Sequence, residues 1–450
     1  MRSLIALLVV FSGAVQAQVE DQPRLVPETA LLTPYELPAQ YLLKGATVHT
    51  VSHGVITNGQ VLVVDGKITA VGTDLKAVLH REIDLSGLHL YPGLIAASSP
   101  LGLVEIGAVR ATRDLSEVGS YTPDVKSWLA VNPDSELIPV ARSGGVAFSL
   151  AVPSGGVVSG QSGLMQLEGW GMEEMAFAKP VALHVTWPNM RLRLAPKERL
   201  NDPKSWKSPA DQDQARKAKI EELSRFFGDA RAYREARERG DDDALIEVPA
   251  WEAMIPYVGG EKPVFVNADD VRQIRAALEW AQTNRLKIVI CGGRDAWMVS
   301  KMLATNRVPV VYEHVLERPA RDFDAYDRPF ANPANLVKDG VSVAISLGRG
   351  RFSASMARNL AHAAAHAARH GLGEADAVRS ITLTPAEILG VADRVGSIQK
   401  GRLATLIATD GPLLDVRTKV RRMWFSGREV SLANRQTKLL ERYERRPKRN

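Results

Sequence analysis

Cysteine is nearly absent from this 450-residue chain, which contains only Cys291. A single cysteine excludes an internal disulfide bond and any metal site built from several cysteines. Cys291 ends an apolar run, KIVIC, and is therefore interpreted as a buried thiol on a strand rather than as a nucleophile. The sequence after residue 17 also lacks an apolar run long enough to cross a membrane.

The first residues have the composition of a secretory signal. Arg2 supplies a positive charge, residues 4–11 (LIALLVVF) are apolar but too few to span a bilayer, and small residues lead up to Ala17. This order predicts a signal peptide at residues 1–17, cleaved after Ala17, rather than a membrane helix. The next residue is Gln18 rather than cysteine, which argues against lipid attachment. The expected location is therefore periplasmic or secreted.

The charge balance excludes one class of partner. The formal net charge is +6, but residues 436–450 alone contain six basic and two acidic side chains. A nucleic-acid-binding protein needs a basic face with interleaved aromatic residues on a folded module, and the sequence shows no such segment. We therefore interpret residues 431–450 as a solvated, frayed basic tail and expect no nucleic-acid partner.

Short β-rich runs occur near both ends of the chain. Residues 18–39 are rich in proline and are predicted to form an extended arm, and Asp65-Gly66-Lys67 is predicted as a turn between two strands. The runs in residues 40–89 and 391–430 predict a composite β-sandwich domain built from both chain ends. Its predicted strands are 42–43, 46–48, 60–64, 68–72 and 81–85 in the first segment and 396–398, 404–408 and 419–425 in the second.

Residues 90–390 alternate apolar strands with amphipathic helices, which is typical of a parallel α/β layer. The predicted fold class is α/β, with a TIM-type (β/α)8 barrel beside the small domain. Residues 189–245 are highly charged and are predicted to be a helical insertion on the surface. Seven strands are predicted at 90–96, 146–152, 181–185, 264–266, 288–291, 308–311 and 341–345, with helices at 270–283, 296–305, 354–370 and 374–380.

This order of segments resembles the amidohydrolase superfamily. The run YLLKGATVHTVSHGVITNGQVLVVDGKITAVG is similar to that family's N-terminal sheet, and Pro92-Gly93-Leu94-Ile95 is similar to its entry into the barrel. The runs TLTPAEILGVADRVGSIQKGRLATLIATDG and VRRMWFSGREV resemble its final helix and returning sheet. The imidazolonepropionase-like branch is the most similar. The resemblance implies hydrolysis of carbon–nitrogen bonds with one or two divalent metals, such as zinc, that activate water.

The metal ligands that the resemblance implies do not occur at the matching positions. The family has a His-x-His pair after its first barrel strand, two further histidines on later strands and an aspartate on the last. Here the first strand reads PGLIAASSPLGL, with Ala96 in place of the preceding aspartate. Serine, proline, glycine and asparagine are poor or impossible ligands for a zinc-type centre, so no metal or other cofactor is expected. The matching positions are Ser98, Pro100, Asn267, Gly292, Gly293 and Gly348.

Three other residues offer a candidate catalytic cluster. His184, in KPVALHVTW, ends a candidate strand, and Glu313 and His314 follow the strand VPVVY. If all three side chains point into the barrel mouth, they form a new metal or acid–base site. The simpler interpretation is a hydrogen-bonded histidine that lines a closed-off pocket.

Histidines at 362, 366 and 370 recur every four residues in NLAHAAAHAARHG. This spacing places them on one face of a helix, where two imidazoles can chelate a transition metal. Gly371 predicts the end of that helix, and histidines near a helix C-terminus also suit the helix dipole. A surface stripe on the outer ring of the barrel is favoured over a metal site.

A glycine-rich segment, PSGGVVSGQS, is a candidate pocket loop. Its glycines favour a loop whose backbone amides can hold an anion, but the GK[ST] ending of a nucleotide-binding loop is missing. By resemblance, a loop of this kind lies near the active-site mouth and contacts a ligand. No His–Asp arrangement lies nearby, so its serines are not expected to be nucleophiles. The candidate residues are Ser154, Gly155, Gly156, Ser159, Gly160, Gln161 and Ser162.

The sequence leads to three functional hypotheses. The first is a degenerate, non-catalytic homologue that acts as a ligand binder or as a partner subunit, in a homo-oligomer or with an active exported paralogue. Copurification with such a paralogue would support the partner role. The second is a hydrolase of carbon–nitrogen bonds, in non-peptide or peptide-like amides, with a relocated or absent metal. The third is an envelope-interaction protein that uses the basic tail and the N-terminal arm.

Overall fold

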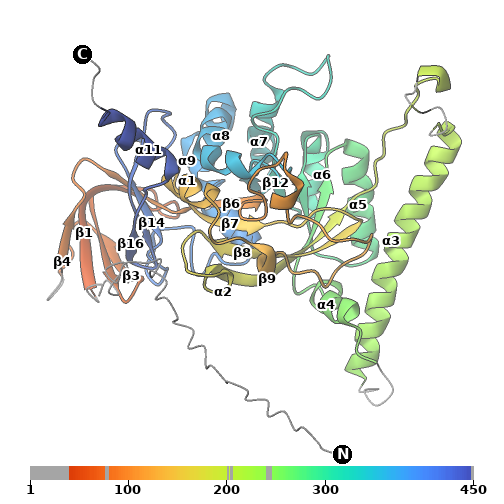
Figure 1. Cartoon of the computed structure of the whole chain (residues 1–450), viewed down its shortest axis with the longest axis horizontal. Helices are drawn as coiled ribbons and strands as arrows, with labels where there is room; N and C mark the ends of the chain where they lie inside the picture. Colours follow the sequence, from red (N-terminus) through yellow and green to blue (C-terminus); the bar gives the residue numbers. More distant parts are fainter. Residues whose placement is uncertain (1–39, 77–80, 200–201, 203–205, 240–245, 447–450) are drawn as a thin grey trace, which may run out of the picture. The chain divides into compact units, whose positions relative to one another are not determined.

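Two eight-stranded sheets form the framework of the part of the chain that the computed structural model describes, residues 40–76, 81–199, 202, 206–239 and 246–446 (Figure 1). The signal peptide predicted at residues 1–17 and the arm predicted at 18–39 lie outside these residues. The predicted α/β fold, a barrel with a second sheet from both chain ends, is confirmed.

The first sheet combines both ends of the described chain. Figure 1 shows its red N-terminal strands beside blue C-terminal strands. The order is β16-β15-β14-β5-β1-β2-β3, with β4 also paired to β1. Asp65 and Gly66 both have positive φ angles, 47° and 76°, as a tight two-residue turn between β2 and β3 requires. The strands are β1 Gln40–His49, β2 Val55–Val64, β3 Lys67–Gly72, β4 Arg81–Asp84, β5 His89–Pro92, β14 Leu406–Thr409, β15 Val420–Phe425 and β16 Arg428–Val430.

This first sheet has its own apolar core. Side chains from β1 and β2, such as Leu43 and Val61, pack with Leu406 of β14 and Trp424 of β15, and all four are at most 1% exposed. A core shared between the two ends of the chain holds them together through the hydrophobic effect, not through backbone pairing alone.

The second sheet is the barrel wall, with strands in the order β6 to β13. All seven predicted barrel strands are present and run parallel to one another, but the eighth, β8, is antiparallel to both of its neighbours. Strand β8 therefore links β7 to β9 through two antiparallel pairings, whereas in a (β/α)8 barrel a crossover helix joins successive parallel strands. The strands are β6 Leu94–Ser99, β7 Val146–Ala151, β8 Val158–Gln166, β9 Ala176–Thr186, β10 Val264–Ala268, β11 Ile288–Gly292, β12 Val310–Tyr312 and β13 Val343–Ile345.

The gap between the first and last barrel strands is bridged by an irregular segment. The Ile345 amide donates to the Ser380 carbonyl at 3.0 Å, and the Ile95 amide donates to the Ile381 carbonyl at 2.9 Å. Ser346 Oγ, just after β13, donates to the Ser98 carbonyl at 2.6 Å. Hydrogen bonds thus join the two edges of the sheet and nearly close the barrel.

Helices follow most barrel strands in the chain. The first turn of α5 has a capping box. The Asp270 side chain accepts a hydrogen bond from the Arg272 amide, and the Gln273 side chain accepts one from the Asp270 amide. The helices are α1 Leu137–Ser143, α2 Met172–Met175, α3 Pro209–Glu238, α4 Pro249–Val258, α5 Val271–Thr283, α6 Ser300–Thr305, α7 Arg328–Lys338, α8 Leu360–Ala367, α9 Glu374–Arg379, α10 Leu383–Ile388 and α11 Arg435–Glu444.

Three predicted elements differ from the structure. The predicted strand 90–96 is two strands, because the chain passes at Gly93 from the first sheet into the barrel. A β-carbon at Gly93 would lie 2.5 Å from the β-carbon of Ala147, so glycine allows this close passage. The segment 396–398 is irregular rather than a strand, although the Ile398 amide donates to the Thr50 carbonyl. The tail predicted at 431–450 contains α11, which Asn434 caps and which buries no side chain. Within residues 431–446, the part of this tail that the structure describes, residues 435–444 are helical rather than frayed.

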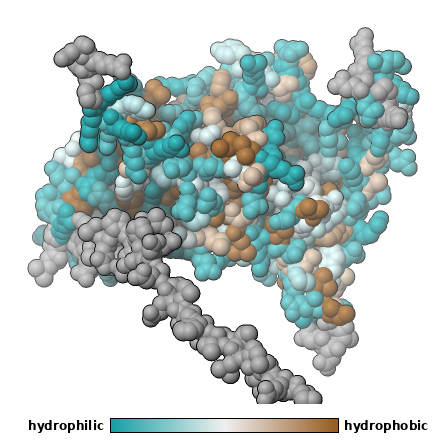
Figure 2. All heavy atoms as spheres, in the orientation of Figure 1, coloured by the Kyte–Doolittle hydropathy of each residue, from teal (hydrophilic) through white to brown (hydrophobic). Residues whose placement is uncertain are grey.

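None of the described helices is long and apolar enough to cross a membrane. On the face seen in Figure 2, hydrophilic residues predominate and hydrophobic ones form small groups between them.

Candidate functional site

Four polar or thiol side chains share one face of the barrel sheet. The strand register places His184 of β9 on the same face of the sheet as Asn267 of β10. Asn267 is paired with Cys291 of β11, whose side chain lies on that face too. The alternation of side chains continues this face to Glu313, just after β12. Arg349 acts electrostatically on both His184 and Cys291, although β10 separates their strands. This face is therefore the concave interior of the barrel, at the carboxyl ends of the strands.

The interior has unused hydrogen-bonding capacity. Among the described residues, Ser98 Oγ, both His184 ring nitrogens, Asn267 Oδ1 and Glu313 Oε1 are buried without a partner. An unsatisfied buried polar atom costs about 1–3 kcal/mol, and most such atoms in proteins are paired with protein, water or a ligand. Water or a small polar ligand at the barrel mouth would satisfy these atoms.

Arg349 and Glu313 form an ion pair at this mouth. Arg349 Nη1 donates to Glu313 Oε2 at 2.6 Å, and the Glu313 side chain is only 6% exposed. Burial opposes the charge of the guanidinium, but Glu313 together with the nearby Cys291 and Asp269 outweighs burial and raises the pKa of Arg349. The site therefore contains a fixed positive charge that comes from the protein itself.

His314 lies between two carboxylates. Its Nε2 is 2.6 Å from Asp269 Oδ1, and its Nδ1 is 2.6 Å from Glu317 Oε2. Burial alone would lower the pKa of His314, but these two hydrogen bonds raise it to about 9. The protonated ring in turn lowers the pKa values of Asp269 and Glu317. His314 is consequently an imidazolium near neutral pH, which donates from both nitrogens and has no free lone pair.

His184 has the opposite environment. Its side chain is 1% exposed and packs edge-on against Phe265, with ring centroids 5.4 Å apart. Desolvation and then the positive charge of Arg349 lower the pKa of His184 to about 3. Cys291 is buried on β11 as predicted, and burial raises the pKa of its thiol. The predicted cluster is therefore divided: Glu313 and His314 join separate polar pairs, and His184 is neutral and unpaired.

The backbone conformation favours glycine at the three predicted ligand positions that are glycines. Gly292, Gly293 and Gly348 have φ angles of +90°, +68° and +87°, which favour glycine. A β-carbon on Gly292 would lie 2.3 Å from Asp269 Oδ1, and one on Gly293 would lie 2.8 Å from Val310 Cγ1. The present backbone therefore has no room for a histidine side chain at 292 or 293.

These residues do not fit a divalent metal of the family type. Asn267 Oδ1 and Ser98 Oγ are weak donors, and the side chain of Pro100 has no donor atom. Asp269 is already bonded to His314, and the Arg349 guanidinium is bonded to Glu313. A dication would have to compete with two positive groups for the same carboxylates.

The predicted pocket loop is a loop only in its first part. Residues 152–157 connect β7 to β8, whereas Ser159, Gly160, Gln161 and Ser162 lie within β8. A β-carbon at Gly160 would lie 2.7 Å from the Val125 carbonyl oxygen, so glycine is needed here for a close approach rather than for a loop.

Side chains of this segment mostly have structural partners. Gln161 Nε2 donates to the Pro123 carbonyl at 2.9 Å and its Oε1 accepts from the Tyr257 hydroxyl at 3.3 Å. Ser154 and Gly155 pack near residues 115–116, with the Ser154 amide donating to the Leu115 carbonyl. Gly156 and Val157 line a cavity of about 490 Å³, which Asp269 and Arg294 also line.

The histidine stripe is not a single helical face. Helix α8 ends at Ala367, and His370 has non-helical angles. His366 and His370 stack on Phe330 of α7, with ring centroids 5.4 and 4.8 Å apart, and His370 Nδ1 is 2.8 Å from the His366 carbonyl. These two rings therefore have aromatic packing contacts on α7.

Comparisons with known proteins agree with this architecture. The amidohydrolase family matches residues 324–432. Among solved structures, an amidohydrolase from Thermotoga maritima MSB8 is 27% identical with a TM-score of 0.75, over 87% of this chain and 99% of that one. A comparison with curated proteins gave no match.

Two more distant structures share the fold alone. A prolidase complexed with N-methylphosphonate-L-proline is 14% identical with a TM-score of 0.51, over 87% of this chain and 99% of that one. A Xaa-Pro dipeptidase with bound methionine has the same identity and TM-score, over 87% of this chain and 100% of that one. The match over residues 324–432 and the 27%-identical amidohydrolase, which aligns with most of this chain, support the resemblance of the chain to the amidohydrolase superfamily.

Sequence reasoning missed several residues at the mouth. Arg349 directly follows the predicted position Gly348, and Asp269 follows Asn267 by two residues. Both lie just beyond the carboxyl end of a barrel strand, where functional side chains of this fold occur. A search for any charged residue at strand ends, beyond the family's own ligands, would have found them.

Proposed function

We propose that this protein is an amidohydrolase homologue that works without the metal centre of its family and binds a small polar molecule at the barrel mouth. The observation that carries the proposal is the Arg349 guanidinium, 2.6 Å from Glu313 and electrostatically coupled to His184 and Asp269. It supplies a positive charge close to where the family would hold a cation. The glycine geometry at Gly292 supports the same interpretation, because a histidine does not fit there.

The unpaired polar atoms support a binding role. Asn267 Oδ1 and Glu313 Oε1 offer acceptors, and the neutral imidazole of His184 offers one acceptor and one donor. A ligand with both donors and acceptors would satisfy them, which would offset their burial cost.

Metal content is the first test. Untagged protein purified without chelators is expected to contain well below one equivalent of any transition metal by mass spectrometry. Added Zn²⁺ or EDTA is expected to leave the melting temperature unchanged, because the described residues contain no group of three or more His, Cys, Asp or Glu side chains that could hold the ion. A stoichiometric metal, or amide hydrolysis that depends on added Zn²⁺, would overturn the proposal, and substitutions at His184 and His314 would then locate the site.

The ligand role is tested by Asn267→Leu. This change removes an unpaired buried oxygen, so the stability of the fold is expected to be unchanged or raised. Small molecules released on denaturation and identified by mass spectrometry are expected from the wild type but not from Asn267→Leu. Ser397→Ala is the matched control, since the Ser397 hydroxyl is also buried without a partner but lies outside the barrel strands. Equal recovery from the wild type and both variants, or no recovery from any of them, would count against binding at the mouth.

A second candidate is hydrolysis of carbon–nitrogen bonds with a relocated or absent metal, and the His314–Asp269 pair favours it. The raised pKa of His314 allows it to donate a proton near neutral pH but not to accept one. Activation of water would need another base, and neutral His184 is held at 1% exposure. Binding is therefore better supported than hydrolysis.

A further inference from the structure

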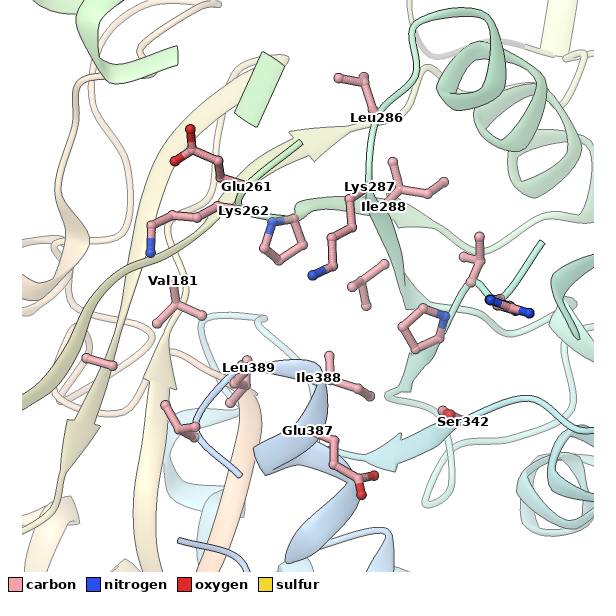
Figure 3. Close-up of a pocket in the computed structure, with 18 of the residues that line it drawn as sticks. Val181, Glu261, Lys262, Leu286, Lys287, Ile288, Ser342, Glu387, Ile388 and Leu389 are labelled. Carbon is pink, nitrogen blue, oxygen red and sulfur yellow. The ribbon is translucent and has the colours of Figure 1, made fainter. Parts of the chain in front are cut away.

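A large cavity lies at the other end of the barrel, away from the mouth. Its volume is about 1040 Å³, and it opens among the residues that precede β10, β11, β12 and β13 (Figure 3). The last turn of α10 and the following residues, 387–391, complete its wall. Family members carry their chemistry at the carboxyl ends of the strands, so this amino-terminal cavity is separate from the proposed function and does not rest on it.

The cavity has an apolar wall. Val181, Ile288 and Val341 are 4–5% exposed and line it together with Leu286 and Val308, which are each 9% exposed. Apolar surface of this kind contributes roughly 25 cal/mol for each Å² that a ligand removes from water. The wall therefore favours a ligand with a hydrocarbon or aromatic body.

The side chains that border this wall are mainly basic. Three of the basic residues have neutral or no partners: Lys262 Nζ donates to the Pro180 carbonyl, and no carboxylate in the described part of the chain pairs with Lys287 or Arg307. Arg394 stacks on the Phe177 ring at 4.1 Å. The lining contains five basic residues and two acidic ones, Lys179, Lys262, Lys287, Arg307 and Arg394 against Glu261 and Glu387.

The acidic residues do not neutralise the centre of the cavity. Glu387 is bonded to Arg379 at 2.7 Å, outside the lining. Figure 3 shows the Lys287 ammonium group directed into the open space, with the carboxylates of Glu261 and Glu387 at its edges. An anionic group placed near Lys287 would therefore meet positive charge that has no competing carboxylate partner.

We propose that this cavity binds an amphipathic organic anion, a molecule with an apolar body and a carboxylate or similar group. The body lies on the wall formed by Ile288, Val308 and Val341, and the anionic group is held by Lys287 and Arg307. An inorganic anion would leave the apolar wall in water, and an uncharged hydrocarbon would leave the two cations unpaired. The combination of wall and charge selects a ligand that has both.

Isothermal titration of the full-length protein with decanoate, compared with decan-1-ol, tests this inference. Decanoate is expected to bind saturably, and Lys287→Glu or Arg307→Glu to weaken it by about tenfold or more, since reversal of a charge repels the carboxylate. Decan-1-ol binding should change little in the same variants. Lys287 and Arg307 are exposed, so the fold is expected to persist, which circular dichroism would check.

The matched control is Lys301→Glu, an exposed lysine of α6 that does not line the cavity. It should bind decanoate like the wild type, as should Asn267→Leu at the barrel mouth. The inference is overturned if the wild type fails to bind decanoate saturably. It is also overturned if Lys301→Glu weakens binding as much as Lys287→Glu, or if decanoate and decan-1-ol respond alike to both charge reversals.

Discussion

Arg349→Leu is expected to lower the free energy of unfolding by about 3 kcal/mol, because it leaves the Glu313 carboxylate buried without its counter-charge. The Glu313 side chain is 6% exposed and Arg349 Nη1 is 2.6 Å from it. We expect a loss at the lower end of the range of stability changes seen when a buried ion pair is broken, because the Arg349 side chain is itself 23% exposed. Urea denaturation at pH 7 provides the measurement.

The double variant Arg349→Leu/Glu313→Leu separates pairing from packing. Removal of both charges is expected to recover most of the lost stability, since an apolar pair of similar volume is often neutral or better. Arg417→Leu serves as a control, because its ion pair with Asp415 is formed by a side chain that is 86% exposed. A loss in the control as large as that in Arg349→Leu would mean that the interior pair has no special role. A double variant less stable than the single one would contradict the assignment of the loss to an unpaired charge.

Acidification from pH 6.5 to pH 4.5 is expected to cost the wild type about 2–3 kcal/mol more than a His184→Gln variant. The folded-state pKa of His184, about 3, lies below the ordinary value of 6.5. Between those two pH values His184 is protonated in the unfolded chain but neutral in the folded chain, so the free energy of unfolding decreases as pH falls. Glutamine does not titrate, and the variant should lose this part of the pH dependence.

The measurement is the difference in slope between the two proteins, whatever their absolute stabilities. His314 contributes equally to both proteins and cancels in this difference, since its folded pKa of about 9 keeps it protonated in the folded state over this range. His53→Gln, at an exposed position, is the control and should follow the wild type. Parallel curves for the wild type and His184→Gln would show that His184 is hydrated or charged in the folded protein.

The fold could be predicted where local pattern decides structure. The parallel barrel strands are continuous apolar runs, such as those at β10 and β11, and each is followed by a helix with a clear period. Strand β8 was missed because glycine and serine dominate its sequence. Its Gly163 packs against Trp128, where a β-carbon would lie 2.9 Å from that of the tryptophan. Tertiary contact, rather than strand propensity, makes this segment a strand.

The site could be predicted only in part, because tertiary contacts between distant segments also decide which side chains meet there. His184, Glu313 and His314 were found because strand ends are visible in a sequence. Their partners were not, since Arg349 is 36 residues from Glu313 and Asp269 is 45 residues from His314. Such pairs depend on which strands become neighbours. The alternative of one cluster of His184, Glu313 and His314 stays untested as chemistry, but the pKa is lowered for His184 and raised for His314.

The first sheet has a consequence for synthesis of the chain. Its strand β5 pairs with β14, and its core contains Trp424 of β15, more than 300 residues later in the sequence. This layer therefore remains without part of its core until nearly the whole polypeptide has been made. Contacts of such long sequence separation form slowly. The first sheet consequently cannot complete its core until elongation has passed Trp424.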